Sequence, residues 1–85
     1  MPYIRPESRE AFDEWLGRGP GFLKMSAGEL NYVITTLCLC WLNGAVGYAN
    51  YNDVVGVLET TKLEFYRRAL APYEDEKRKS NGDVY

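Results

Sequence analysis

The stretch SAGELNYVITTLCLCWLNG, residues 26–44, decides the fold, because it joins helix end signals to an apolar pattern of helical period. Ser26 with Glu29 three residues later is a capping box, which marks the start of a helix. Gly44 suits the left-handed position just past a helix end. We therefore predict a helix over residues 27–43. One side of it carries a full apolar stripe, made of Leu30, Val33, Ile34, Leu37, Cys38 and Trp41.

This predicted central helix is also apolar on its other side, where Tyr32, Leu39 and Leu42 lie. A helix that is apolar all round belongs either in the middle of a fold or between subunits. A chain of 85 residues buries only about 60–65% of its unfolded surface, so its small core gains from a covering partner. We therefore expect a homo-oligomer.

A helix is also predicted before the central one, over residues 6–16. Pro6 suits its first turn, where the missing N–H would be unpaired anyway. The helix should stop at Gly17, where a segment with three glycines and a proline within five residues begins. We interpret residues 17–25 as a linker, with an anion-binding loop as the alternative, although this segment lacks the Lys-Ser/Thr of phosphate loops.

A third helix is predicted over residues 51–71, with Asn50 or Asn52 as its N-cap. Pro72 ends or kinks it, because a proline cannot donate the helical hydrogen bond. A short final helix, residues 73–79, and a tail, residues 80–85, should follow, with Gly82 closing the helix. The sequence thus predicts a single domain over residues 1–85. Its fold class is all-α, a small three-helix domain with a short C-terminal helix after the proline.

The overall charge argues against two classes of partner. With a net charge of −2 and a pI near 5.0, the chain lacks the basic footprint of a nucleic-acid-binding domain. Its apolar run at residues 37–42 is far shorter than the ~20 residues that span a bilayer. No signal peptide is recognisable, so we expect a soluble protein of the cytoplasm, with reduced thiols.

Catalysis and metal binding find little support in the sequence. Cys38 and Cys40 are the only cysteines, and two residues along a helix point about 200° apart, so we expect core thiols and no disulfide. The chain has no histidine and no third cysteine that would complete a metal site. With no histidine base and only scattered carboxylates, we predict a protein that is no enzyme and needs no cofactor or metal.

The candidate binding residues lie in the third helix and after it. Lys62 falls inside a broad apolar arc of that helix, with Glu59 three residues before it. Either its stem lies on the core and its ammonium reaches water beside Glu59, or it lies at a subunit interface or ligand pocket. Arg67, with Glu64 and Glu74, projects to the opposite side.

Aromatic and arginine residues complete the set of candidates. Tyrosine and arginine are frequent at binding hot spots, and arginine grips phosphates and carboxylates with two hydrogen bonds. The alternative is a core tyrosine followed by two solvated arginines. The ligand- or partner-binding residues that we predict are Glu59, Lys62, Tyr66, Arg67, Arg68, Tyr73 and Tyr85.

Four short segments of the sequence resemble those of a known family. They are GELNYVIT at residues 28–35, KLEFYRR at 62–68, APYED at 71–75 and NGDVY at 81–85. The family consists of short proteins of bacteriophages and bacteria and is classed as a domain of unknown function. The resemblance covers residues 28–85 and implies a phage or prophage context, but no activity and no residue roles.

That context suggests a protein that acts on its bacterial host by binding. We expect an oligomer that occupies a host protein, for host takeover or against host defence. One alternative is a sponge that sequesters a nucleotide-derived signal between subunits, since tyrosines stack on bases and arginines bind phosphates. Another is a structural or scaffold component.

Overall fold

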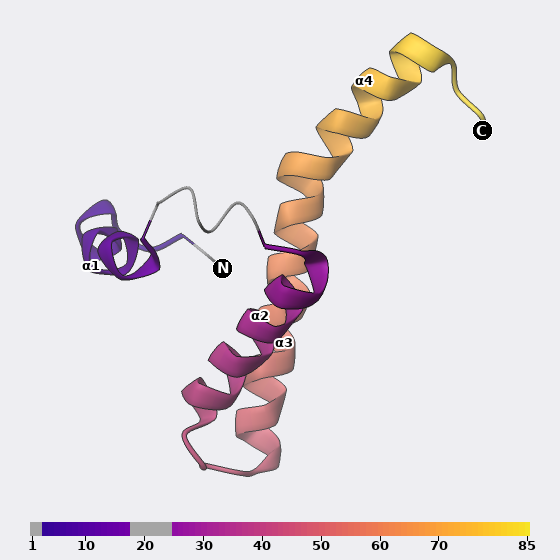
Figure 1. The fold of residues 1–85 in the computed structure, drawn as a ribbon. Coiled ribbons are helices and arrows are strands. Elements are labelled where there is room, and N and C mark those ends of the chain that lie inside the picture. Colours follow the sequence, from indigo (N-terminus) through magenta and orange to yellow (C-terminus); the bar gives the residue numbers. More distant parts are fainter. Residues whose placement is uncertain (1–2, 18–24) are drawn as a thin grey trace. The chain divides into compact units, whose positions relative to one another are not determined.

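The computed structural model describes residues 3–17 and 25–85, which are helical apart from short connections and ends (Figure 1). Among these residues there is no strand, and the predicted all-α class is confirmed. The helical elements are α1 (Pro6–Leu16), α2 (Ala27–Leu42), α3 (Tyr48–Phe65), the π-helical segment η2 (Tyr66–Leu70) and α4 (Ala71–Asn81).

Backbone contacts group the described residues into two compact units. One holds α1, α2 and the first turn of α3, up to Asn52, and the other holds the rest of the chain from Asp53. The single domain over residues 1–85 stays a prediction.

Helix α1 has the predicted bounds. Its N-cap Arg5 is extended and Pro6 occupies the first helical position. Gly17 ends the helix in the left-handed conformation (φ 56°), and its N–H donates to the carbonyls of Asp13 and Glu14 at 3.1 and 3.2 Å. Residues 18–24 of the predicted linker, and with them the anion-loop alternative, lie outside the described residues.

Helix α2 is fixed by its capping box. The Glu29 N–H donates to Ser26 Oγ at 3.1 Å, and the Ser26 N–H donates to Glu29 Oε1 at 3.0 Å, so two free backbone donors are satisfied. At the other end the left-handed conformation begins at Asn43 (φ 48°), one residue before the predicted Gly44 (φ 76°). Asparagine adopts this region more readily than most residues, which suits Asn43 to the first of two successive left-handed positions.

Helix α3 begins at Tyr48, earlier than predicted. Gly47 is the reason, because its carbonyl accepts the first helical hydrogen bond, from Tyr51 N–H at 3.0 Å, and glycine is tolerated at an N-cap without a capping side chain. The predicted cap Asn50 lies inside the first turn, where its side-chain amide donates to Ala45 O at 3.0 Å. The assignment of Asn50 or Asn52 as N-cap was therefore wrong.

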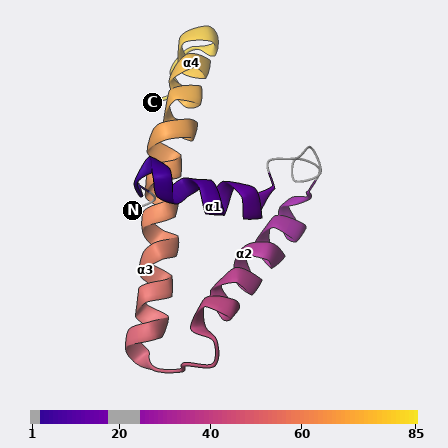
Figure 2. The ribbon, with the colours of Figure 1, turned by 90° about the vertical axis from the view of Figure 1, so that its left-hand side faces the viewer.

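Pro72 does not end the helix. Helical structure continues through η2 into α4, as Figure 2 shows, and Pro72 lies in the first turn of α4. The Ala71 N–H donates to the carbonyl of Tyr66, five residues back, so one turn is widened to π geometry. A proline has no N–H and its ring clashes with the carbonyl four residues back, and the wider turn just before it relieves that clash.

Helix α4 runs to Asn81, so Ser80 and Asn81 of the predicted tail are helical. Gly82 closes it, as predicted, with a positive φ of 87° and an extended ψ of 151°, and donates its N–H to Arg78 O at 2.9 Å. Residues 83–85 then turn back along the helix.

Little side-chain surface is buried. Among the described residues Leu42 alone is buried, with 9% of its surface exposed. No helix within residues 3–17 and 25–85 combines the length and apolar character of a membrane span.

Candidate functional site

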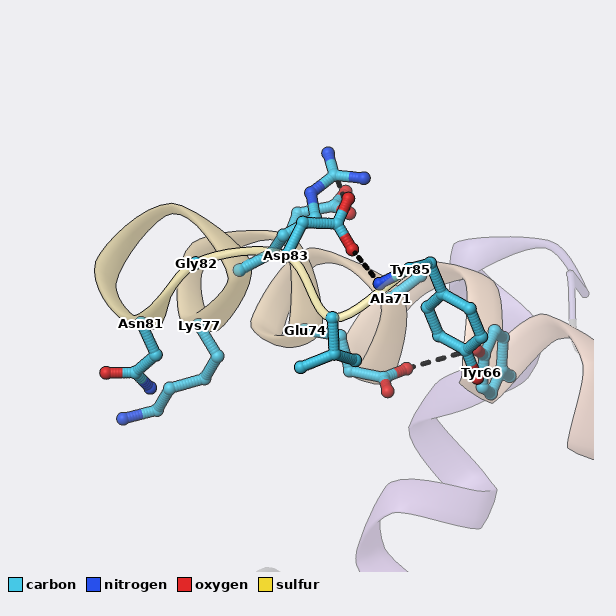
Figure 3. Close-up of a pocket in the computed structure, with 11 residues that line it drawn as sticks. Tyr66, Ala71, Glu74, Lys77, Asn81, Gly82, Asp83 and Tyr85 are labelled. Carbon is cyan, nitrogen blue, oxygen red and sulfur yellow. Dashed lines mark hydrogen bonds and ion pairs between the residues drawn. The ribbon is translucent and has the colours of Figure 1, made fainter.

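An open depression lies where the C-terminal tail returns along α4 (Figure 3). Its volume is about 490 Å³, and its walls come from η2, α4 and the tail, all within the unit that begins at Asp53. Tyr66 and Tyr85 are its aromatic residues, and five charged side chains join them. Two of the predicted binding residues are therefore brought together here.

The π-helical turn aligns Tyr66 with Glu74. In an uninterrupted α-helix two residues eight apart lie about 80° apart around the axis. The widened turn between them takes up roughly one extra residue and brings them onto one face. As a result the Tyr66 hydroxyl donates to Glu74 Oε1 at 3.0 Å, across the position of Pro72 (Figure 3).

This contact sets the acidity of Tyr66. The hydrogen bond to the Glu74 carboxylate, reinforced by its negative charge, raises the pKa of the Tyr66 phenol above its usual value of 10.0. We expect Glu74→Gln to keep an acceptor but to remove the charge, so that the Tyr66 pKa falls back toward its usual range.

The measurement is an NMR titration of the ring-labelled tyrosines. Glu76→Gln is the matched control, since it removes a charge from the same helix but has no hydrogen bond to Tyr66. A Tyr66 pKa that is the same in wild type and Glu74→Gln would show that Glu74 is not its acceptor in solution.

The tail supplies the other wall of the depression. The Tyr85 N–H donates to Asp83 Oδ1 at 2.9 Å, which holds the last residues in a turn. Figure 3 shows the Tyr85 ring beside that of Tyr66. Both rings remain open to solvent, so the depression is a shallow surface feature without an enclosed interior.

The charges around the depression do not favour an anion. Its lining carries three carboxylates, from Glu74, Asp75 and Asp83, against two cations, Lys77 and Arg78. Arg78 lies 3.8 Å from Asp75, and the Lys77 ammonium lies 5.6 Å from the centre of the Tyr73 ring, a cation–π distance.

The remaining predicted residues lie elsewhere in the same unit. Lys62 Nζ is 3.2 Å from Glu59 Oε1, and both side chains are more than half exposed. Arg67 Nη2 is 2.7 Å from Glu64 Oε1. Arg68 is exposed. The candidates therefore do not converge on one pocket, and Lys62 and Arg67 each lie beside the carboxylate of the residue three positions earlier.

A second open feature lies on α2. Ala27, Gly28, Asn31, Tyr32 and Thr35 line a hollow near its start, where the Thr35 hydroxyl donates to Asn31 Oδ1 at 3.2 Å. The Tyr32 side of α2, which extends one heptad on to Leu39, is strongly exposed, at 72% for Tyr32 and 63% for Leu39. None of the residues that line this hollow is among the predicted binding residues, although Tyr32 and Leu39 both belong to the second apolar set of the helix.

The two cysteines are free thiols in different surroundings. Cys38 is half-buried, but Cys40 is exposed, so the prediction of two core thiols is wrong for Cys40. Their divergence around the helix explains this, since only one of two such positions can face inward. Within the part of the chain that the structure describes, no three potential ligands among His, Cys, Asp and Glu gather as a metal site would need.

The comparisons with known proteins identify a family only. No curated protein and no solved structure matches the chain. The family match includes the first third of the sequence, which lies outside the four segments that resemble the family. The chain belongs to the family described as Domain of unknown function (DUF6899), whose model matches residues 1–84.

Proposed function

We propose that this chain is a non-enzymatic binding protein of phage or bacterial origin, which works as a small homo-oligomer on a host protein in the bacterial cytoplasm. Occupying that host protein would serve host takeover or block a defence component. The exposed apolar surface of α2 carries the proposal.

The argument rests on the two sides of α2. Its long stripe includes Leu30, Leu37 and Trp41, and its other side carries Tyr32 and Leu39, each of them at least 40% exposed. One neighbouring helix covers one side of such a helix, so the second side still needs a partner. Contiguous exposed apolar surface on a small domain is typical of protein interaction sites.

The hollow beside Tyr32 makes this second side suitable for a protein ligand. Gly28 has no side chain, and a Cβ placed there would meet only Ser26 Oγ, at 3.9 Å. An apolar side chain of a partner fits such a hollow, with Asn31 and Thr35 as polar rim. We name the surface formed by Gly28, Asn31, Tyr32, Thr35 and Leu39 the α2 face.

The nucleotide sponge has weaker support. It needs free positive charge, but Lys62 and Arg67 each lie within 3.2 Å of a carboxylate. The depression beside Tyr66 has more carboxylates than cations in its lining. The aromatic pair Tyr66 and Tyr85 is the observation in its favour, because nucleobases stack on such rings.

Native mass spectrometry of the protein purified from its bacterial host tests these alternatives. We expect multiples of the 9.7 kDa chain together with a host polypeptide in fixed ratio. Tyr32→Asp should abolish that complex, because it places a charge in the middle of the α2 face. Tyr48→Asp is the matched control, since Tyr48 is exposed at the start of α3, where an acidic residue is well tolerated.

Other masses would contradict the proposal. A bound small anion that is lost in Lys62→Met would establish the sponge. Large assemblies of the chain alone would indicate a scaffold. A host polypeptide that stays bound to Tyr32→Asp would remove the α2 face from the proposal.

A further inference from the structure

We infer that α3 pairs with α3 of a second copy of this chain, in antiparallel orientation, around a two-fold axis between Glu59 and Lys62. The inference rests on the proposed function, which requires an oligomer, and specifies the surface and geometry of self-association. All residues that carry it lie in the unit that begins at Asp53.

A seam of heptad period runs along α3 to Tyr66, the first residue of η2. Val55, Glu59, Lys62 and Tyr66 follow one another at steps of four, three and four residues, which keeps them on one narrow face of the helix. Each of these side chains is at least half exposed. A seam of this spacing is the feature by which two helices pack side by side over several turns.

The order of the residues in the seam fits an antiparallel partner. In such a pair, residues at equal distances on either side of the axis face each other. With the axis midway between Glu59 and Lys62, Glu59 faces the second copy's lysine at position 62, and Val55 faces its tyrosine at position 66. Leu58 and Leu63 flank the seam on opposite sides and widen its apolar surface. Both pairs of seam residues across the axis are therefore either apolar against apolar or acid against base.

The ion pair between Glu59 and Lys62 within one chain also fits the antiparallel arrangement. Glu59 Oε1 and Lys62 Nζ already lie 3.2 Å apart in one chain, and their side chains are 54% and 68% exposed. A copy turned by half a turn places its lysine over the first chain's carboxylate, so that four charges of alternating sign surround the axis. An in-register parallel copy would place like charges against each other, which is unfavourable.

The available area sets the strength of the contact. Val55, Leu58, Leu63 and Tyr66 are 64%, 42%, 57% and 50% exposed. Together with the stems of the central ion pair they offer roughly 500 Å² per copy, which places the interface near the lower limit of specific complexes. We therefore expect a dimer that forms at micromolar concentration.

Charge exchange tests the pairing directly. Glu59→Lys makes both central residues of each chain basic, and Lys62→Glu makes both acidic. Sedimentation equilibrium should show the dimer dissociation constant raised about ten-fold or more in each variant alone, because like charges then meet at the axis. An equimolar mixture of the two variants should associate again, as a heterodimer with an affinity close to that of the wild type. The double variant Glu59→Lys/Lys62→Glu should dimerise like the wild type.

Glu76→Lys is the matched control. It breaks the same kind of exposed ion pair, with Lys79 at 3.5 Å, but lies on α4 outside the seam, so the dimer should be unchanged. Circular dichroism of each variant shows whether the helices persist. A single variant that is unfolded alone but helical in the equimolar mixture would support the pairing as well.

The outcomes separate this inference from the proposed function. A wild-type dimer that Glu59→Lys leaves intact would overturn the pairing but not the proposed function. A wild-type chain that is monomeric at about 100 µM, well above micromolar dissociation constants, would overturn the pairing and the oligomeric part of the proposed function. Binding of the host protein through the α2 face would then still be decided by Tyr32→Asp.

Discussion

Replacing Pro72 with alanine is expected to convert η2 into ordinary α-helix and to stabilise the chain. A proline in a helix interior costs up to about 3 kcal/mol, and the widened turn recovers only part of this. With an N–H restored at position 72 and the ring removed, nothing favours the five-residue hydrogen bond from Ala71 N–H to Tyr66 O over ordinary α-helical bonds. We expect a gain of about 1–3 kcal/mol in the free energy of unfolding, measured by urea denaturation.

The same substitution should separate Tyr66 from Glu74. Without the extra residue in the turn, Glu74 lies about 80° further around the helix, and the 3.0 Å hydrogen bond is lost. The phenol pKa, now raised by that bond, should return toward its usual value. Because a raised pKa favours the protonated phenol in the folded chain, the wild type gains this stabilisation below pH 10.0 and loses it as the pH rises through the folded-state pKa. The variant should lack that loss.

Pro6→Ala is the matched control for Pro72→Ala. Pro6 occupies the first helical position, where no hydrogen bond is missing, so its removal should change stability by less than about 0.5 kcal/mol. Persistence of the five-residue bond in Pro72→Ala, seen by NMR, would show that Pro72 is not what widens the turn.

Leu42→Ala is expected to be the most destabilising truncation in α2. Leu42 is the one buried side chain among the described residues, with 9% exposed, and truncation of a buried leucine costs about 2–5 kcal/mol. We expect the free energy of unfolding to fall by about 2 kcal/mol, at the low end of this range, because a chain with so little buried surface relaxes around the gap. The measurement is the shift in the urea midpoint at unchanged slope.

Leu39→Ala provides the comparison on the same helix. Leu39 is 63% exposed, so the same chemical change should cost less than about 0.5 kcal/mol beyond helix propensity. Equal losses in the two variants would mean that in solution the surface around Leu39 is covered as well, as it would be in an oligomer that buries the α2 face.

The elements with local signals were predictable from the sequence. The capping box of Ser26 and Glu29 and the glycines at positions 17 and 82 act through the backbone of their own helix ends, and the structure has them where the sequence places them. The start of α3 was missed because Gly47 caps it without a side chain, which leaves no signal of the usual kind.

The candidate site was predictable only in part, and Pro72 is the reason. A projection at constant angle per residue places Glu74 about 80° around the helix from Tyr66, and the π-helical turn removes that separation. The proline itself was the available signal, since relief of its clash by a wider turn shifts every later residue by about one position. The wall formed by Asp83 and Tyr85 depends on how the tail folds back, which no periodic pattern encodes.

The reversal at Gly82 determines where an appended segment would emerge. A peptide joined to Tyr85 would start beside Tyr66, part-way along the helix, and not at the tip of α4. An affinity tag or fluorescent protein fused there would crowd the rings of both tyrosines and compete for the seam to which Tyr66 belongs. Fusions intended to report on assembly therefore belong at the amino end of the chain.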